Sequence, residues 1–325
     1  MKLIYYLLFH VGLIQHSLVG KTNKYSYLAF RKLHGLTNGK VNRKESEKIN
    51  RKSQKHNFTE LTHGITGELD SNGLSKIVEE LNTHGYHVFD QKLSLEQCDQ
   101  IIDTSLTIPA NTIPKNECEP VLIFDSKNPK APMYKFNEED LLENESLRSI
   151  LFDVNFLRIA QEYLNCLPLN DIFVMWWSSV FSNNPNSHAA QLYHFDMDHL
   201  KFIKFFIYLT DVDAKSGPHC YVRGSHKNKP LALSNDRRYE DVEIQAHYQD
   251  DDFIEITGQK GTIVAVDTSG FHKGKLPENR ERLIVQIEYT NSFFGQKVAN
   301  LKKAGITVSS NQFLEKFQDS FRRLF

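Results

Sequence analysis

Short apolar runs crowd the stretch between residues 172 and 289, and they constrain the fold more than any other feature. The runs cover residues 172–181, 201–209, 252–258, 261–267 and 282–289. Each is rich in β-branched and aromatic residues and is bounded by turn-forming residues, which is typical of strands. Strands at such short spacing favour a sandwich or barrel over alternating βαβ units. The sequence therefore predicts a mainly β domain.

Helical patterns flank this β-rich stretch. The expected helices cover about residues 74–84, 95–106, 147–165 and 313–321. In the first, Leu74, Ile77 and Leu81 keep helical spacing. Gly85 ends that helix before a short strand over residues 86–89, and Ser94 begins a capping-box pattern that opens the next helix. We expect these helices to pack around the sheet.

The N-terminal part divides into two expected segments. Residues 1–20 are apolar, but His10, Gln15 and His16 interrupt the run. We expect a retained helix, packed on the body or lying on a membrane surface, rather than a signal peptide or anchor, and we do not favour membrane contact. Residues 21–60 are predicted to be an exposed basic linker, because residues 21–57 hold eleven Lys or Arg and only two acids. The folded domain is expected to cover residues 70–325.

Overall charge and cysteine content exclude several classes of protein. The chain of 325 residues has 39 Lys and Arg against 40 Asp and Glu, so no basic excess indicates a nucleic-acid partner. Four cysteines are scattered without a CxxC pair, which excludes zinc-finger and thioredoxin motifs. This favours a reducing compartment, so we expect a cytoplasmic location. The oligomeric state stays open.

Two histidines and one aspartate form the candidate metal site. His194 and Asp196 are two residues apart in a strand-like segment, so their side chains point to the same side. His272 follows the apolar strand 261–267 and can supply a third ligand. Two histidines and one carboxylate on one face of a metal suit non-haem iron(II) and its oxygen chemistry.

An arginine near this site is predicted to anchor a second molecule. Arg282 begins the last apolar strand, and its guanidinium can hold a carboxylate through two parallel hydrogen bonds. A diacid that binds the metal at one end needs such an anchor at its other end. Arg280 lies in the preceding polar loop, so Arg282 is the favoured residue.

These segments resemble the phytanoyl-CoA dioxygenase family of iron(II)/2-oxoglutarate oxygenases. The resemblance rests on residues 193–227 and 261–289, where the His-x-Asp pair, an acidic stretch, a Gly-Ser-His turn, a glycine-led strand, a distal histidine and an arginine follow in order. Residues 74–106 also resemble the N-terminal part of that family. Two departures occur: Arg223 stands where proline is common before the turn, and Gly274 replaces a frequent hydroxyl residue.

The resemblance implies a fold, a ligand set and a reaction. The fold is a double-stranded β-helix, a cupin-like jelly roll with flanking helices. His194, Asp196 and His272 bind iron(II), Arg282 binds the carboxylate of 2-oxoglutarate, and Lys135 assists it. The enzyme is a dioxygenase that consumes O2, releases succinate and CO2, and hydroxylates a substrate. Its substrate is a small organic molecule or a lipid- or sugar-linked intermediate, and halogenating relatives lack the carboxylate that Asp196 supplies.

Two other functions fit the same residues. A jelly-roll binding protein could keep this site without catalysis. A cupin-type isomerase or hydrolase could use another metal, although such proteins usually supply more histidines and do not need Arg282. Release of succinate with iron and 2-oxoglutarate separates the three.

Overall fold

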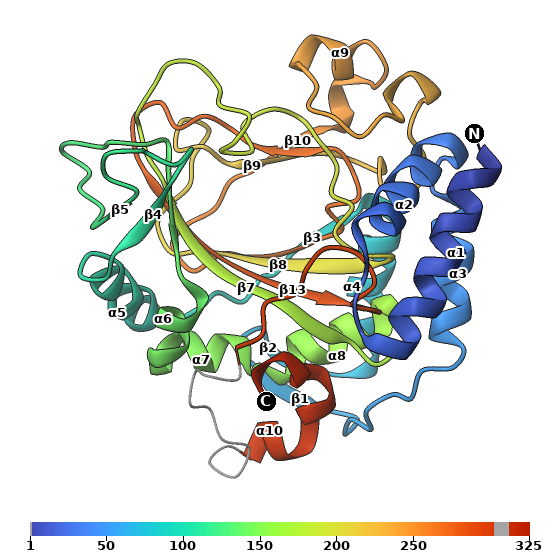
Figure 1. The fold of residues 1–325 in the computed structure, drawn as a ribbon. Helices are drawn as coiled ribbons and strands as arrows, with labels where there is room; N and C mark the ends of the chain where they lie inside the picture. The colour runs from blue at the N-terminus through green and yellow to red at the C-terminus, as the bar shows by residue number, and fades with distance from the viewer. Residues whose placement is uncertain (1, 302–311) are drawn as a thin grey trace.

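Two antiparallel β-sheets face each other across the centre of the molecule (Figure 1). The structure is a computed structural model that describes residues 2–301 and 312–325. In order across the larger sheet, the strands are β3 (Tyr86–Val88), β11 (Ile263–Val266), β8 (Phe202–Tyr208), β13 (Arg282–Thr290), β7 (Leu169–Ser178), β6 (Met133–Phe136), β4 (Ala110–Ile113) and β5 (Val121–Leu122). The smaller sheet has the order β10 (Phe253–Ile256), β9 (His219–Val222) and β12 (His272–Gly274). The predicted jelly roll with flanking helices is confirmed.

Alternation along the central strands gives the larger sheet two different faces. Strand β13 pairs with β7 on one side and β8 on the other. Its residues Leu283, Val285 and Ile287 join the main hydrophobic core. Since successive side chains in a strand point to opposite faces, Arg282 and Gln286 point toward the smaller sheet. The space between the sheets therefore receives the polar side chains.

Helices cover the outer face of the larger sheet. They are α4 (Ser71–His84), α5 (Leu95–Ser105), α6 (Glu138–Glu143), α7 (Glu145–Leu151) and α8 (Val154–Leu164), with α10 (Gln312–Phe317) and the 3-10 helix η5 (Gln318–Leu324) below them (Figure 1). A hairpin of β1 (Thr62–Gly64) and β2 (Gly67–Leu69) also lies there. The single helix predicted over 147–165 is divided in two. Asp153 interrupts it, because its carboxylate accepts hydrogen bonds from the backbone N–H of Asn155 and Phe156 and so caps α8.

The basic stretch after residue 20 differs from the linker that the sequence predicts. It contains α2 (Lys24–Thr37) and α3 (Lys40–Asn50), which follow α1 (Lys2–Val19). Although α3 has few apolar residues, it packs against the protein through polar side chains, some of which are hydrogen-bonded. The Asn291 amide donates to Ser46 Oγ at 2.8 Å and to Asn50 Oδ1 at 2.9 Å. Polar packing of this kind leaves no hydrophobic periodicity to detect. The domain boundary near residue 70 stays a prediction.

Candidate metal centre

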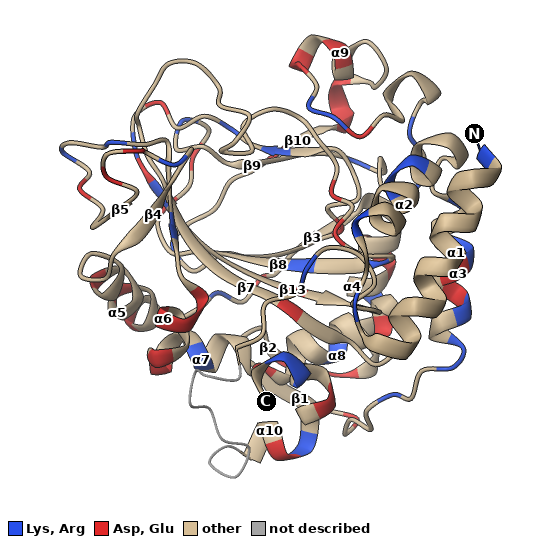
Figure 2. Cartoon of the chain, in the orientation of Figure 1, with Lys and Arg blue, Asp and Glu red and all other residues tan. Residues whose placement is uncertain are grey.

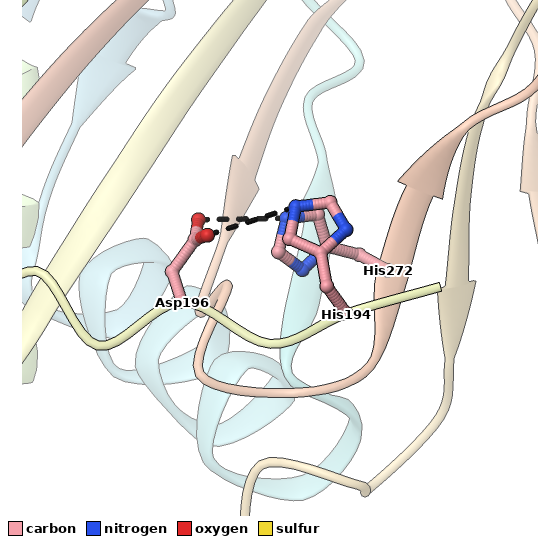
Figure 3. Close-up of side chains that lie close together, drawn as sticks. All are labelled: His194, Asp196 and His272. Atoms are coloured by element: carbon pink, nitrogen blue, oxygen red, sulfur yellow. Dashed lines mark ion pairs between the residues drawn. The ribbon is translucent and has the colours of Figure 1, made fainter. Parts of the chain in front are cut away.

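Backbone pairing brings the two histidines together. His194 and His272 are direct partners in an antiparallel bridge, with N–H···O distances of 3.0 and 2.8 Å in the two directions. Their ring centroids lie 4.2 Å apart. The Asp196 backbone N–H donates to the Thr268 carbonyl at 2.8 Å, which holds the aspartate beside the loop that leads to His272. Figure 3 shows the three side chains converging. One possible ligand atom from each lies within 4.8 Å of the others.

Hydrogen bonds fix which ring nitrogen of each histidine is free. His194 Nδ1 lies 2.9 Å from the Leu192 carbonyl, and His272 Nδ1 lies 3.0 Å from the Gly270 carbonyl. A carbonyl oxygen only accepts, so each Nδ1 must carry the proton. Both Nε2 lone pairs then face Asp196, at 3.7 and 3.4 Å from its carboxylate oxygens. Burial lowers the pKa of His194 well below its usual range, and the neighbouring His272 adds to this. The site therefore offers a neutral, metal-ready imidazole there.

A buried lysine, Lys204 on β8, holds the aspartate in its ionised form. Its Nζ lies 2.7 Å from Asp196 Oδ2, 2.8 Å from Asp198 Oδ2 and 3.2 Å from Glu288 Oε2. Burial opposes ionisation of Asp196, but the Lys204 ammonium and His272 hold the pKa of that carboxyl well below its usual range. The same three carboxylates raise the pKa of Lys204 well above its usual value despite its burial. A charged carboxylate is the form that binds a metal.

Arg282 points into the same cavity, as the strand pattern predicts. Its guanidinium is 96% buried with the rest of the side chain, donates to the Gly217 carbonyl, and lies 3.4 Å from Ser178 Oγ. Arg280 is exposed and does not line this cavity. A side-chain carbon added at Gly274 would lie 3.3 Å from Arg282 Nη2. A larger residue at 274 would therefore contact the guanidinium directly, and Ser178 supplies the nearby hydroxyl instead.

The cavity between the sheets has a volume of about 320 Å³. It is lined by His194, Asp196, His272 and Arg282. Lys135 on β6 lines it too, so the structure brings together every site residue that the sequence predicts. Lys135 is exposed at the protein surface, but desolvation by its neighbours lowers its pKa. The cavity wall also contains Trp176, Phe206 and Ile284, which make part of the lining apolar. The functional roles of the five predicted residues stay predictions.

Sequence reasoning missed three further residues that line the cavity. Lys204 is a single charged residue in an otherwise apolar, fully buried strand, and that pattern could have identified it. His219 stacks on His272 with ring centroids 5.4 Å apart, but it lies on β9, whose place beside the site no local pattern indicates. Arg238 lies at the cavity mouth on a loop, and within the described residues its guanidinium makes no ion pair.

A second histidine and carboxylate cluster lies behind Lys204. Asp171, His199 and Glu288 are all buried, with possible ligand atoms within 4.8 Å of one another. His199 Nε2 lies 2.8 Å from Asp171 Oδ2, and its Nδ1 faces the Phe294 carbonyl at 3.3 Å. Burial, and then the charge of Asp198, raise the pKa of Asp171 to about 8. Burial beside Asp171 also raises the pKa of Glu288 well above its usual range.

The chain is similar to one known protein family and to several solved structures. A family model described as phytanoyl-CoA dioxygenase matches residues 81–276. No curated protein matches the chain. Similar solved structures include EctD from S. alaskensis with bound Fe, at 12% identity and a TM-score of 0.49, covering 73% of this chain and 83% of that one. Another is HygX from Streptomyces hygroscopicus with nickel, 2-oxoglutarate and hygromycin B, at 13% identity and a TM-score of 0.47, covering 68% and 88%.

Proposed function

The chain belongs to the phytanoyl-CoA dioxygenase family, and from this we propose that it is an iron(II)- and 2-oxoglutarate-dependent oxygenase. The observation that carries the proposal is the convergence of His194, Asp196 and His272 on one point, with both histidine lone pairs directed there. The donor set is chemically suited to iron(II), since two imidazoles and one carboxylate leave three coordination positions for other ligands. These three residues would hold the metal.

Iron(II), when bound, activates O2 so that one oxygen atom enters 2-oxoglutarate, which leaves as succinate and CO2, while the other oxidises the substrate. The protein supplies position and charge. Arg282 would bind the distal carboxylate of 2-oxoglutarate, and its burial makes that pair strong. Lys135, in the same cavity, would add a second positive charge. His219 stacks on His272 and lines the same cavity as Arg282, where it would limit the orientations open to the cosubstrate.

We further propose that the reaction on the substrate is hydroxylation. Asp196 supplies a charged protein ligand, which leaves no vacant protein-ligand position for a halide. A cavity of about 320 Å³ suits a small organic molecule, and its apolar wall at Trp176 and Ile284 suits a hydrocarbon portion. The positive charge of Arg238 at the mouth would attract an acidic or phosphorylated substituent on the same molecule.

Succinate formation tests the proposal. Purified protein is supplied with iron(II), 2-oxoglutarate and O2, and succinate is followed while candidate acidic small molecules are screened. Wild-type protein should release succinate, and Asp196→Ala should release none. A wild-type protein that binds iron and 2-oxoglutarate but never forms succinate would instead be a binding protein. Adding chloride tests the reaction type, because any product of a hydroxylase gains oxygen and no chlorine.

A further inference from the structure

Helix α1 presents an unpartnered apolar face to solvent. We call this the α1 outer face, and it consists of Leu3, Ile4, Leu7, Val11, Ile14 and Leu18, which are 50–82% exposed. The residues recur at spacings of three and four, so they lie along one side of the helix. Single exposed apolar residues are ordinary, whereas a continuous stripe of them marks an interaction site.

The opposite side of α1 is fitted to the protein. Phe9 is fully buried, and its ring meets Phe294 with centroids 5.5 Å apart. Gly12 allows α1 to approach α2, because a side-chain carbon there would lie 2.2 Å from Ser26 Cβ. Ser26 Oγ also donates to the Leu8 carbonyl at 2.9 Å. One side of α1 therefore packs in a defined position against the protein, and this packing leaves the α1 outer face exposed.

Charge identifies what this face would meet. Residues 2–44 contain eight Lys or Arg and no Asp or Glu, although the whole chain has nearly equal numbers of basic and acidic residues. Figure 2 shows basic residues along α2, and basic residues together with Glu45 and Glu47 along α3, beside α1. Lys2 lies at one end of α1, and Lys21 and Lys24 lie just beyond the other. An apolar stripe with lysines at its ends and a basic surround is complementary to an anionic lipid surface.

Contrary to the expectation from sequence alone, we propose that the α1 outer face binds the surface of an anionic phospholipid bilayer, with α1 lying in the membrane plane. By length and composition alone α1 could also cross a membrane. Signal sequences and core helices of soluble proteins can have the same length and composition. Phe9 and Gly12, however, hold its other side against the protein, so the seated helix offers lipid only one face. The headgroups would meet the exposed lysines while the apolar stripe enters the acyl boundary.

A second copy of the chain is a poorer occupant of the same face. A two-helix contact along Ile4, Leu7 and Val11 would be flanked by uncharged residues such as Leu8, so no ion pairs would set its register. It would also bring two strongly basic segments together, and their charges repel. Lipid phosphates neutralise that charge instead.

Vesicle binding by the full-length protein tests the proposal. The protein is sedimented with phosphatidylcholine vesicles that contain or lack phosphatidylserine. We expect binding to the anionic vesicles, weaker binding at high salt, and little binding to the neutral ones. The double variant Leu7→Glu, Val11→Glu should lose at least about tenfold in affinity, because it places two charges where apolar side chains would enter the acyl boundary. Its thermal unfolding should match that of wild type, because both residues are exposed.

A matched control places glutamates at apolar residues of comparable exposure elsewhere. Leu231→Glu and Val242→Glu change residues that are 80% and 71% exposed, and they should leave vesicle binding unchanged. The proposal is overturned if wild-type protein does not sediment with anionic vesicles, or if the α1 variant binds as well as the control. A wild-type dimer that Leu7→Glu converts to a monomer would assign the face to a second copy. Bound protein that resists alkaline carbonate would show a spanning helix.

Discussion

Two clusters of histidine and carboxylate lie on either side of Lys204, and they differ in what they face. The first, His194, Asp196 and His272, opens on the cavity between the sheets. The second, Asp171, His199 and Glu288, is sealed in the protein and lies outside that cavity's lining. In the described residues these are the two groups whose atoms could hold a metal. Similar side chains thus occur in two different settings.

The difference shows that the groups around a set of histidines and carboxylates decide whether that set is ready to bind a metal. In the open cluster both histidine lone pairs face the carboxylate, and Lys204 keeps that carboxylate charged. In the sealed cluster the Lys204 ammonium lies 3.2 Å from Glu288 Oε2. Its positive charge stands where a metal ion would otherwise be needed. His199 Nδ1 faces a carbonyl and donates its hydrogen there, so Nε2 accepts a hydrogen bond from the protonated carboxyl of Asp171. We therefore interpret the sealed cluster as a buried proton-sharing group.

The largest expected effect is a loss of bound iron when the open cluster, but not the sealed cluster, is changed. Asp196→Ala should reduce bound iron to background and turnover by more than about 100-fold, because it removes the charged ligand of a three-ligand site. Glu288→Gln alters the sealed cluster and should keep one equivalent of iron. Metal analysis of the purified proteins measures both. Two equivalents of iron in wild type, falling to one in Glu288→Gln, would show that the sealed cluster also binds metal.

A second test removes the residue that joins the clusters. Lys204→Met should destabilise the protein by about 3–5 kcal/mol, because it leaves buried carboxylates without their cation. Denaturant unfolding gives this value. Adding Glu288→Gln to Lys204→Met should recover part of the loss, since the buried group that faced the ammonium can then no longer ionise. If the double variant is no more stable than Lys204→Met, Glu288 is not the charge that Lys204 compensates.

A third test concerns the anchor that only the open cluster has. Arg282→Lys should raise the KM for 2-oxoglutarate about tenfold or more, because a lysine cannot form two parallel hydrogen bonds with a carboxylate. Arg280→Lys is the matched control, since Arg280 is exposed and outside the cavity. Equal KM values for the two variants would place the cosubstrate carboxylate elsewhere, with Lys135 the next residue to change.

Local patterns predicted the open cluster and missed the sealed one for a physical reason. His194 and Asp196 share a strand face, and Arg282 begins an apolar strand, so short-range rules were enough to place them. The sealed cluster joins β7, β13 and the loop before β8, and its register depends on pairing across more than 80 residues. The burial of α3 was missed in the same way, because long-range polar contacts such as Asn291 to Ser46 hold it.

The smallest expected effect is a change in pH dependence from the sealed cluster. The pKa of Asp171 is raised to about 8 in the folded protein, chiefly by burial, while an unfolded aspartate titrates near its ordinary value of about 3.9. Between these values the folded state holds a proton that the unfolded state has released. Asp171 therefore contributes a loss of stability as pH rises from about 4 to about 8.

Asp171→Asn should remove that contribution, because its amide can donate to His199 Nε2 without titrating. The unfolding free energy of the variant minus that of wild type should thus increase with pH, by at most about 1.4 kcal/mol per pH unit over this range. Denaturant unfolding at several pH values measures the difference, and other titrating groups cancel in it. A difference that stays flat would mean that the folded Asp171–His199 pair does not hold this extra proton over the range. The sealed cluster would then not be a proton-sharing group, and the contrast with the open cluster would rest on Lys204 alone.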